Sequence, residues 1–150
     1  MIRYIIPLFM IIFCTVFGQS ASTSREIIST PDAPPAIGPY SQAIKVRNTL
    51  YLAGQIALDP NTGKMVDGGI ESQTHRVMQN LAAVLKTAGF GFDDVVQAQV
   101  FLADLNDYKA MNIVYAEYFG KTPPARAVVE AARIPRDALV EIMMVAVSPD

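Results

Sequence analysis

The chain has 150 residues, 51% of them hydrophobic, and a formal net charge of −2 at pH 7. This length and composition suit one compact domain with a substantial apolar core, and they exclude a disordered chain. The mildly acidic balance, without a basic stripe, provides no electrostatic footprint for a phosphate backbone, so nucleic acid is not an expected partner.

The first residues have the organisation of a secretory signal peptide. Arg3 precedes an uncharged apolar run that ends at Gly18, and small and polar residues follow it. We predict that residues 1–18 are a signal peptide cleaved after Gly18, with Ala21 as the less favoured cleavage position. An uncleaved anchor is the alternative, although a bilayer span needs about 20 apolar residues. The mature domain, residues 19–150, is therefore expected in the periplasm or outside the cell, without a stable membrane span.

Removal of this segment would change the chemistry available to the protein. Arg3 is its only charged residue, so 11 basic and 14 acidic side chains would remain and the net charge would become −3. Cys14, the only cysteine, would also be removed, which excludes disulfides and thiol catalysis from the mature domain. His75 is the only histidine and lies near the start of a predicted helix. We interpret it as a surface residue and predict no metal site.

Hydrophobic periodicity divides the rest of the chain into strands and helices. Apolar residues at helical spacing predict two amphipathic helices, which end at Gly89 and Gly120, and apolar runs bounded by turn residues predict strands. In chain order the predictions are an edge strand at 24–30, a loop at 31–42, strands at 43–47 and 49–56 with turns near Asn48 and at 59–63, a helix within 68–89, a strand at 93–104, a helix at 105–120, and two strands within 122–147 joined by a turn at 135–137. This order describes an α+β domain, one sheet with two helices on one face.

The last predicted strand is apolar on both of its faces. Because side chains alternate along a strand, one face would carry Ala138, Val140, Ile142, Met144 and Ala146, and the other Leu139, Glu141, Met143, Val145 and Val147. In the strand at 93–104, the alternation would place Val96, Ala98, Val100 and Leu102 opposite Val95, Gln97, Gln99 and Phe101. Two helices cover only one side of such a sheet. We therefore expect self-association, in a closed homo-oligomer, to cover the other side.

Two charged residues lie in the apolar strands that are predicted near the C-terminus. Arg126 lies in the first of them and Glu141 in the second. A charge in such a place is costly unless it is paired, hydrogen-bonded or facing a pocket that uses it. One alternative is an interface salt bridge, between these two residues or with Glu130 or Asp137. The register of the strands is not fixed by the sequence, so whether the two ions share a face stays open.

Four separated motifs resemble one known family. The motifs "APPAIGPYSQA", "LYLAGQIALDPNTGKMV", "VFLADLNDYKAMN" and "PPARAVVEAARIPRDALVEIMMVAV" are similar to those of the Rid family of enamine/imine deaminases, also called the YjgF family, and the similarity covers about residues 25–148. The resemblance implies a chorismate-mutase-like fold with a mixed sheet, and a homotrimer whose sheets meet in a central barrel. It also implies sites in clefts between subunits, and hydrolysis of a 2-imino acid to a 2-keto acid and ammonia with no cofactor or metal.

The resemblance assigns roles to five residues. Arg126 follows the Pro-Ala pair and corresponds to the ligand of the substrate carboxylate, for which a planar guanidinium offers two parallel donors. Glu141 corresponds to a glutamate that holds or partly deprotonates the attacking water, or shuttles a proton to the departing nitrogen. Tyr40 and Asn106 correspond to further residues of the catalytic site. Gly54 corresponds to a glycine whose backbone approaches the ligand.

Two positions depart from the family pattern, and three of the assigned residues have simpler interpretations. Many members have serine where Ala53 stands, so one hydroxyl contact is absent here, and cysteine where Val128 stands. The backbone carbonyl of that cysteine is the group thought to orient water, and Val128 retains it. Asn106 could instead be a helix N-cap, Tyr40 a packing aromatic, and Gly54 a residue required only by backbone geometry.

The sequence therefore predicts a 2-iminopropanoate/2-iminobutanoate deaminase that uses a small 2-imino acid as substrate. The alternative is a non-enzymatic exported protein, a small-ligand-binding or holdase-like trimer. Ribonuclease activity has been attached to relatives, but the acidic balance and the absence of a histidine pair weigh against it. Export is unexpected for a deaminase, since the pyridoxal-phosphate lyases that produce imines are cytosolic.

Overall fold

A computed structural model describes residues 24–148, so the predicted signal peptide lies outside the described residues. None of the helices in this range is long and apolar enough to cross a membrane. The elements are β1 (Arg25–Ile28), β2 (Ala43–Val46), β3 (Thr49–Gln55), α1 (Ile70–Thr87), β4 (Val95–Leu102), α2 (Tyr108–Ala116), β5 (Ala125–Glu130) and β6 (Val140–Val147), with short 3-10 turns at Phe92–Asp94, Leu105–Asp107 and Pro135–Asp137.

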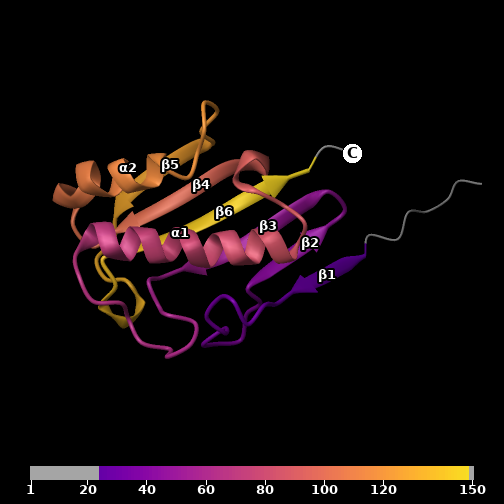
Figure 1. The fold of residues 1–150 in the computed structure, drawn as a ribbon, viewed down its shortest axis with the longest axis horizontal. Coiled ribbons are helices and arrows are strands. Elements are labelled where there is room, and N and C mark those ends of the chain that lie inside the picture. The colour runs from indigo at the N-terminus through magenta and orange to yellow at the C-terminus, as the bar shows by residue number, and fades with distance from the viewer. Residues whose placement is uncertain (1–23, 149–150) are drawn as a thin grey trace, which may run out of the picture.

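The six strands of the described chain form one sheet in the order β1-β2-β3-β6-β4-β5. The pair β4 and β5 is parallel and all other neighbours are antiparallel. Both helices lie on the same face, α1 across β3 and β6 and α2 beside β4 and β5 (Figure 1). This confirms the predicted α+β class with two helices on one face of a mixed sheet. The last two strands are not neighbours, because β4 separates β5 from β6.

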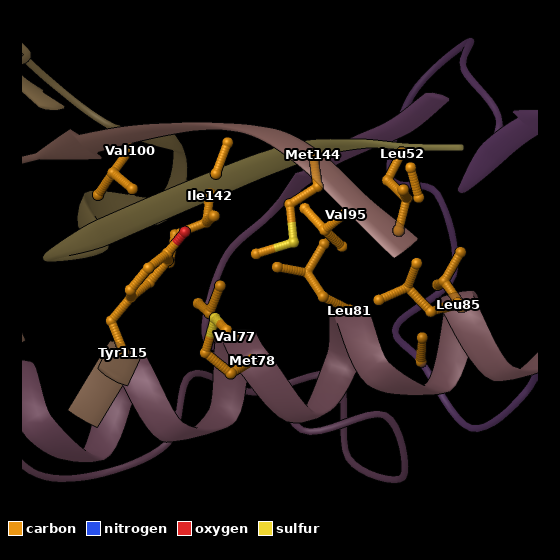
Figure 2. Packing of buried hydrophobic residues seen from close by; sticks show 14 of the residues in the cluster. Leu52, Val77, Met78, Leu81, Leu85, Val95, Val100, Tyr115, Ile142 and Met144 are labelled. Atoms are coloured by element: carbon orange, nitrogen blue, oxygen red, sulfur yellow. The ribbon is translucent and has the colours of Figure 1, made fainter. Parts of the chain in front are cut away.

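The alternation predicted for β6 is confirmed. Val140, Ile142, Met144 and Ala146 are buried against the helices, whereas Glu141 and the other alternate residues are half-buried on the opposite face. Figure 2 shows apolar side chains of α1, among them Val77, Leu81 and Leu85, pointing from the helix toward Met144 and its neighbours in the sheet. Burial of this apolar surface is the main stabilising contribution to the fold.

In β4 the predicted alternation is wrong at its first two residues. Val95 is buried with Ala98, Val100 and Leu102, whereas Val96 is 47% exposed. The cause is a shift in the pairing of β4 with β6 between Val95 and Gln97. A bulge of this kind adds one residue to a strand and so reverses the direction of the side chains that precede it.

The second helix is shorter than predicted. It begins at Tyr108, after the 3-10 turn, and ends at Ala116 instead of continuing to Gly120. Beyond the helix, Tyr118 and Phe119 pack edge-on against Phe92, with ring centroids 5.5 and 5.3 Å apart. The first helix follows the prediction, and Gly89 after it has the left-handed φ of 81° that favours glycine at a helix end.

A buried glutamine holds the long loop that precedes β2. The Oε1 atom of Gln42 accepts a hydrogen bond from the backbone N of Thr30 at 2.6 Å. Its Nε2 atom donates to the carbonyl oxygens of Thr30, Ala33 and Pro34 at 3.0, 3.2 and 2.8 Å. One amide side chain thus fixes the backbone of a segment whose prolines and glycine prevent regular structure.

Two buried amides of α1 hold two further loops in the same way. The Nδ2 atom of Asn80 donates to the carbonyl oxygens of Ile56 and Leu58, at 3.2 and 2.9 Å, in the loop that leaves β3. The Oε1 atom of Gln73 accepts from the backbone N of Leu139 at 2.8 Å, just before β6. The three loops are therefore fastened to the core through their backbone atoms.

We predict that Gln42→Ala lowers the free energy of unfolding by about 3 kcal/mol, because it leaves several buried backbone groups without partners. The matched control is Gln79→Ala on the exposed face of α1, which should change stability by less than about 0.5 kcal/mol. Urea unfolding at one fixed protein concentration measures both values. Equal stabilities for the two variants would contradict the role given to Gln42.

Candidate active site

Glu141 faces a cavity at one end of the sheet, on the side opposite the helices. The cavity has a volume of about 330 Å³ and is lined by Ile37, Tyr40, Ala53, Gly54, Ile56, Pro135 and Glu141. Three of the predicted site residues, Tyr40, Gly54 and Glu141, are therefore together. The walls come from the three segments that Gln42, Asn80 and Gln73 hold or adjoin.

Gly54 makes room for the carboxyl group of Glu141. The pairing of β3 with β6 shifts by one residue between Leu52 and Gln55, which indicates a bulge at this point. A Cβ atom on Gly54 would lie 2.9 Å from Cδ of Glu141 and closer still to its Oε1 atom. No other residue type leaves this space, so Gly54 has a steric role toward Glu141 in addition to the predicted approach of its backbone to a ligand.

Burial raises the pKa of Glu141 above its ordinary value. A carboxyl group in this state exchanges a proton closer to neutral pH than an exposed glutamate does. Tyr40 stands beside it with its hydroxyl accepting a hydrogen bond from the backbone N of Ile37 at 3.2 Å. Tyr40 is 47% exposed in the protomer, so it does not belong to the buried core.

Arg126 lies on the other side of the sheet, among residues of α2. It pairs in register with Ala98 of β4, which in turn is opposite Met144 of β6, and both partners are buried beneath the helices. The centre of its guanidinium group lies 4.5 Å from the ring centroid of Tyr115. Its Nη2 atom donates to the hydroxyl of Tyr108 at 3.5 Å. A second cavity, of about 500 Å³, opens beside these groups.

The salt bridges considered from the sequence do not form in the protomer. Within residues 24–148 Arg126 has no acidic partner. Asp137 instead pairs with Arg133, with 2.7 Å between Oδ1 and Nε, and the Oε2 atom of Glu130 accepts from the backbone N of Leu105 at 2.9 Å. The guanidinium group of Arg126 is therefore held by aromatic rings and keeps an uncompensated positive charge.

The other two predicted residues are Val128 and Asn106. Val128 is two residues after Arg126 in β5 and packs against the core on the same face. Asn106 is exposed in the 3-10 turn before α2. The interpretation of Asn106 as the capping residue is wrong, because the side chain of Asp104 accepts the hydrogen bond from the backbone N of Asn106 at 2.8 Å. The amide group of Asn106 is thus not used to begin the helix.

Five of the six predicted residues form two groups, one on each face of the sheet, with Tyr40, Gly54 and Glu141 on one face and Arg126 and Val128 on the other. Glu141 pairs in register with Phe101, whereas Arg126 pairs with Ala98, and these positions of β4 point to opposite faces. Within one protomer, the sheet separates the guanidinium group from the carboxyl group. The protomer alone does not bring them to one ligand.

Three residues of α2 that lie beside Arg126 were not identified from the sequence. Tyr108, Asn112 and Tyr115 stand at positions i, i+4 and i+7 of α2, a spacing that places them on one helix face. A hydrogen bond with Asn112 and the charge of Arg126 lower the pKa of Tyr108. The spacing was visible in the sequence, but only the structure shows that this face meets β5.

His75 belongs to neither cavity. Its Nδ1 atom lies 3.1 Å from the hydroxyl of Tyr118, and its Nε2 atom lies 3.9 Å from a carboxylate oxygen of Glu117. In the part of the chain that the structure describes, no group of three or more His, Cys, Asp or Glu side chains is arranged to hold a metal ion. The imidazole is partly exposed, as predicted.

The fold and the two cavities define a small α+β protein with an acidic residue, Glu141, at one cavity and a basic residue, Arg126, at the other. Residues 30–148 match the family model described as endoribonuclease L-PSP. The chain belongs to this family, which is the Rid family whose motifs the sequence resembles.

Three relatives illustrate the range of descriptions in the family. The RutC family protein of Pyrococcus horikoshii is 52% identical over 122 residues, 81% of this chain and 97% of that protein. The 2-iminobutanoate/2-iminopropanoate deaminase of Mus musculus is 46% identical over 127 residues, 85% and 94% of the two chains. The structure of E. coli TdcF with bound serine has a TM-score of 0.80 at 35% identity, and covers 83% of this chain and 99% of that chain.

We predict that Gly54→Ala displaces the carboxyl group of Glu141 toward water, so that the pKa of Glu141 falls toward its ordinary value. Carbon-detected NMR titration of the glutamate carboxyl groups measures this shift. The control is Gly91→Ala, where an added Cβ meets no atom within 4 Å. An unchanged pKa of Glu141 in Gly54→Ala would show that the carboxyl group does not depend on this space.

Proposed function

We propose that the protein hydrolyses 2-imino acids, such as 2-iminopropanoate and 2-iminobutanoate, to 2-keto acids and ammonia. In this reaction the oxygen of water bonds to the imine carbon, protons pass to the nitrogen, the carbon–nitrogen bond breaks, and ammonia leaves. The proposal is supported best by two groups that each lie beside a cavity. One is the guanidinium group of Arg126, which has no acidic partner in the described residues, and the other is the carboxyl group of Glu141, whose pKa is raised. The 46% identity to a protein described as a deaminase adds to it.

Arg126 is the proposed ligand of the substrate carboxylate. Its charge has no acidic partner in the described residues, so binding of an anion displaces no internal salt bridge. A guanidinium group donates two parallel hydrogen bonds to a carboxylate, which fixes the plane of the bound group as well as its position. The imine carbon, directly attached to the carboxylate, would then be held in a defined place.

Glu141 is the proposed acid–base group. Its raised pKa allows it to take a proton from the attacking water and to return it to the nitrogen as the carbon–nitrogen bond breaks. Tyr40 would stand at the same cavity, and Asn106 and the carbonyl group of Val128 would lie on the side of Arg126. The absence of a hydroxyl group at Ala53 leaves that part of the wall apolar.

A homotrimer would bring the Arg126 cavity of one protomer and the Glu141 cavity of another together. The face of the sheet that no helix of the described chain covers carries apolar side chains, including Tyr51, Met143, Val145 and Val129. An exposed apolar face of this kind is typical of an interaction surface. We propose that the Arg126 side of one protomer meets the Glu141 cavity of the next, so that each site is shared between subunits.

A second candidate is small-ligand binding without turnover, or a holdase-like role, in the same trimer. The bound serine in the description of E. coli TdcF favours a site for amino-acid-like molecules. Binding of 2-oxobutanoate or serine by a protein that releases no ammonia from 2-iminobutanoate would support this candidate. Ribonuclease activity, which the family description names, has less support, because the only histidine is outside both cavities and the net charge is negative.

We predict that Arg126→Ala lowers kcat/KM for 2-iminobutanoate roughly 30- to 1,000-fold, the loss expected for a charged pair whose partner is removed. Arg126→Lys keeps the charge without the fork and should be intermediate. Lys109→Ala, which removes an exposed charge from α2, is the control and should retain full activity. The imine is produced with an amino-acid oxidase, and equal rates for wild type and Arg126→Ala would refute the role of Arg126.

The shared site is tested by mixing variants. Arg126→Ala and Glu141→Gln proteins, each expected to have much reduced activity alone, are unfolded together, refolded and assayed. Sites built from the intact half of each subunit would restore part of the activity. No recovery in demonstrably mixed oligomers would contradict a site divided between protomers.

We predict an acid limb in the pH profile of kcat/KM. Glu141 must be ionised to accept a proton from water, so the rate should fall as the pH drops through its raised pKa. Glu141→Gln should remove this limb and lower the rate roughly 100-fold or more. Folding raises the pKa of this group, so its ionised form destabilises the fold at neutral pH, and Glu141→Gln should be at least as stable as wild type at pH 7. An acid limb that persists in Glu141→Gln would contradict the assignment.

A further inference from the structure

We infer that Tyr115 is a positioning residue whose ring holds Arg126 in the orientation that binds the substrate carboxylate. This inference deepens the proposed function and rests on it. The centre of the guanidinium group lies 4.5 Å from the ring centroid, within the distance at which an aromatic face attracts a cation. The ring itself is fixed, because Tyr115 is only 5% exposed and belongs to the main hydrophobic core.

The same helix face supplies a second restraint. Tyr108, seven residues before Tyr115, accepts a hydrogen bond from Nη2 of Arg126 at 3.5 Å, and its ring centroid lies 5.9 Å from the guanidinium carbon. The guanidinium group thus lies over the ring of Tyr115 and donates a hydrogen bond to the hydroxyl of Tyr108. Two contacts from one helix restrict rotation of the Arg126 side chain before a ligand binds. Binding then costs less conformational entropy than it would with a freely rotating arginine.

An aromatic ring suits this task better than an acidic side chain. Within residues 24–148 no carboxylate pairs with Arg126. A carboxylate would orient the guanidinium group by occupying the donors that the substrate needs, and it would have to be displaced. The aromatic ring of Tyr115 attracts the cation without neutralising its charge. The binding group is therefore oriented before substrate arrives and remains free to bind it.

The ring and the hydroxyl group of Tyr115 have separable roles. The hydroxyl group is buried and makes no hydrogen bond of ordinary geometry. Burial raises the pKa of Tyr115 to about 12, although the charge of Arg126 and a weak hydrogen bond from its guanidinium group act in the opposite direction. It therefore stays neutral at physiological pH. The positioning role belongs to the ring, and phenylalanine should reproduce it.

The test compares 2-iminobutanoate kinetics, and Kd values for 2-oxobutanoate measured by NMR, in single variants of the full assembly. Tyr115→Leu should raise both KM and Kd roughly 3- to 30-fold with little change in kcat, because the contact serves binding and not the chemical step. Tyr115→Phe, which keeps the ring, should have KM and Kd values within about twofold of those of wild type. Tyr115→Met, with a flexible side chain that fills the space, replaces the leucine variant if that variant does not fold.

Tyr118→Leu is the matched control for a purely structural effect. It removes a half-buried tyrosine ring three residues further along the chain, one that contacts His75 and Phe92 and not Arg126. It should lower stability while leaving KM unchanged. A double-mutant cycle adds a second readout, since Tyr115→Leu should no longer alter Kd for 2-oxobutanoate once Arg126→Ala is present.

The outcomes separate the inference from the function on which it rests. Equal KM values for wild type and Tyr115→Leu, or an equal rise in Tyr118→Leu, would overturn the inference and leave the proposed function intact. An effect of Tyr115→Leu that persists in the Arg126→Ala background would also overturn it. A wild-type protein without activity on 2-iminobutanoate would overturn the proposed function and the inference together.

Discussion

The central position of β6 is the constraint on which the candidate site depends. Because β6 pairs with β3 on one side and β4 on the other, Glu141 is brought directly over the bulge of β3 that contains Gly54. The missing Cβ of Gly54 and the shift in pairing act together, since the bulge places the glycine where the carboxyl group needs space. The raised pKa of Glu141 follows from this enclosure. A single feature of strand order thus links the sheet topology to the chemistry of the cavity.

The two charged groups of the site are stabilised by different means because they lie on different faces. Glu141 is tolerated in an apolar strand because it opens onto a cavity, whereas Arg126 is tolerated at the sheet edge because Tyr115 and Tyr108 of α2 attract its cation. Neither ion neutralises the other within the protomer. The separation leaves both groups available to a ligand, and the proposed reaction would need the proposed assembly to bring them together.

Much of the fold and part of the candidate site could be predicted from the sequence. The rest depends on how strands pair and how helices pack on them. The class, the order of strands and helices along the chain, and the set of residues that share a face with Glu141 follow from periodicity, which is a local property. The exposure of Val96 could not be predicted, because a bulge depends on how two strands pair. That Arg126 and Glu141 lie on opposite faces depends on register, which the sequence leaves open. The contacts of Arg126 with Tyr108 and Tyr115 depend on the packing of α2 beside β5, a tertiary fact that helical spacing alone does not contain.

The buried amides of Gln42, Gln73 and Asn80 have a consequence for how the protein can vary. All their hydrogen bonds to the three loops go to backbone atoms, so the loops are held regardless of which side chains they carry. Loop residues that line the cavity, such as Ile37 and Pro135, can therefore be exchanged while the frame of the cavity stays in place. For the proposed imine substrate, the side chains that select the group on the imine carbon can vary, whereas the scaffold that presents them cannot.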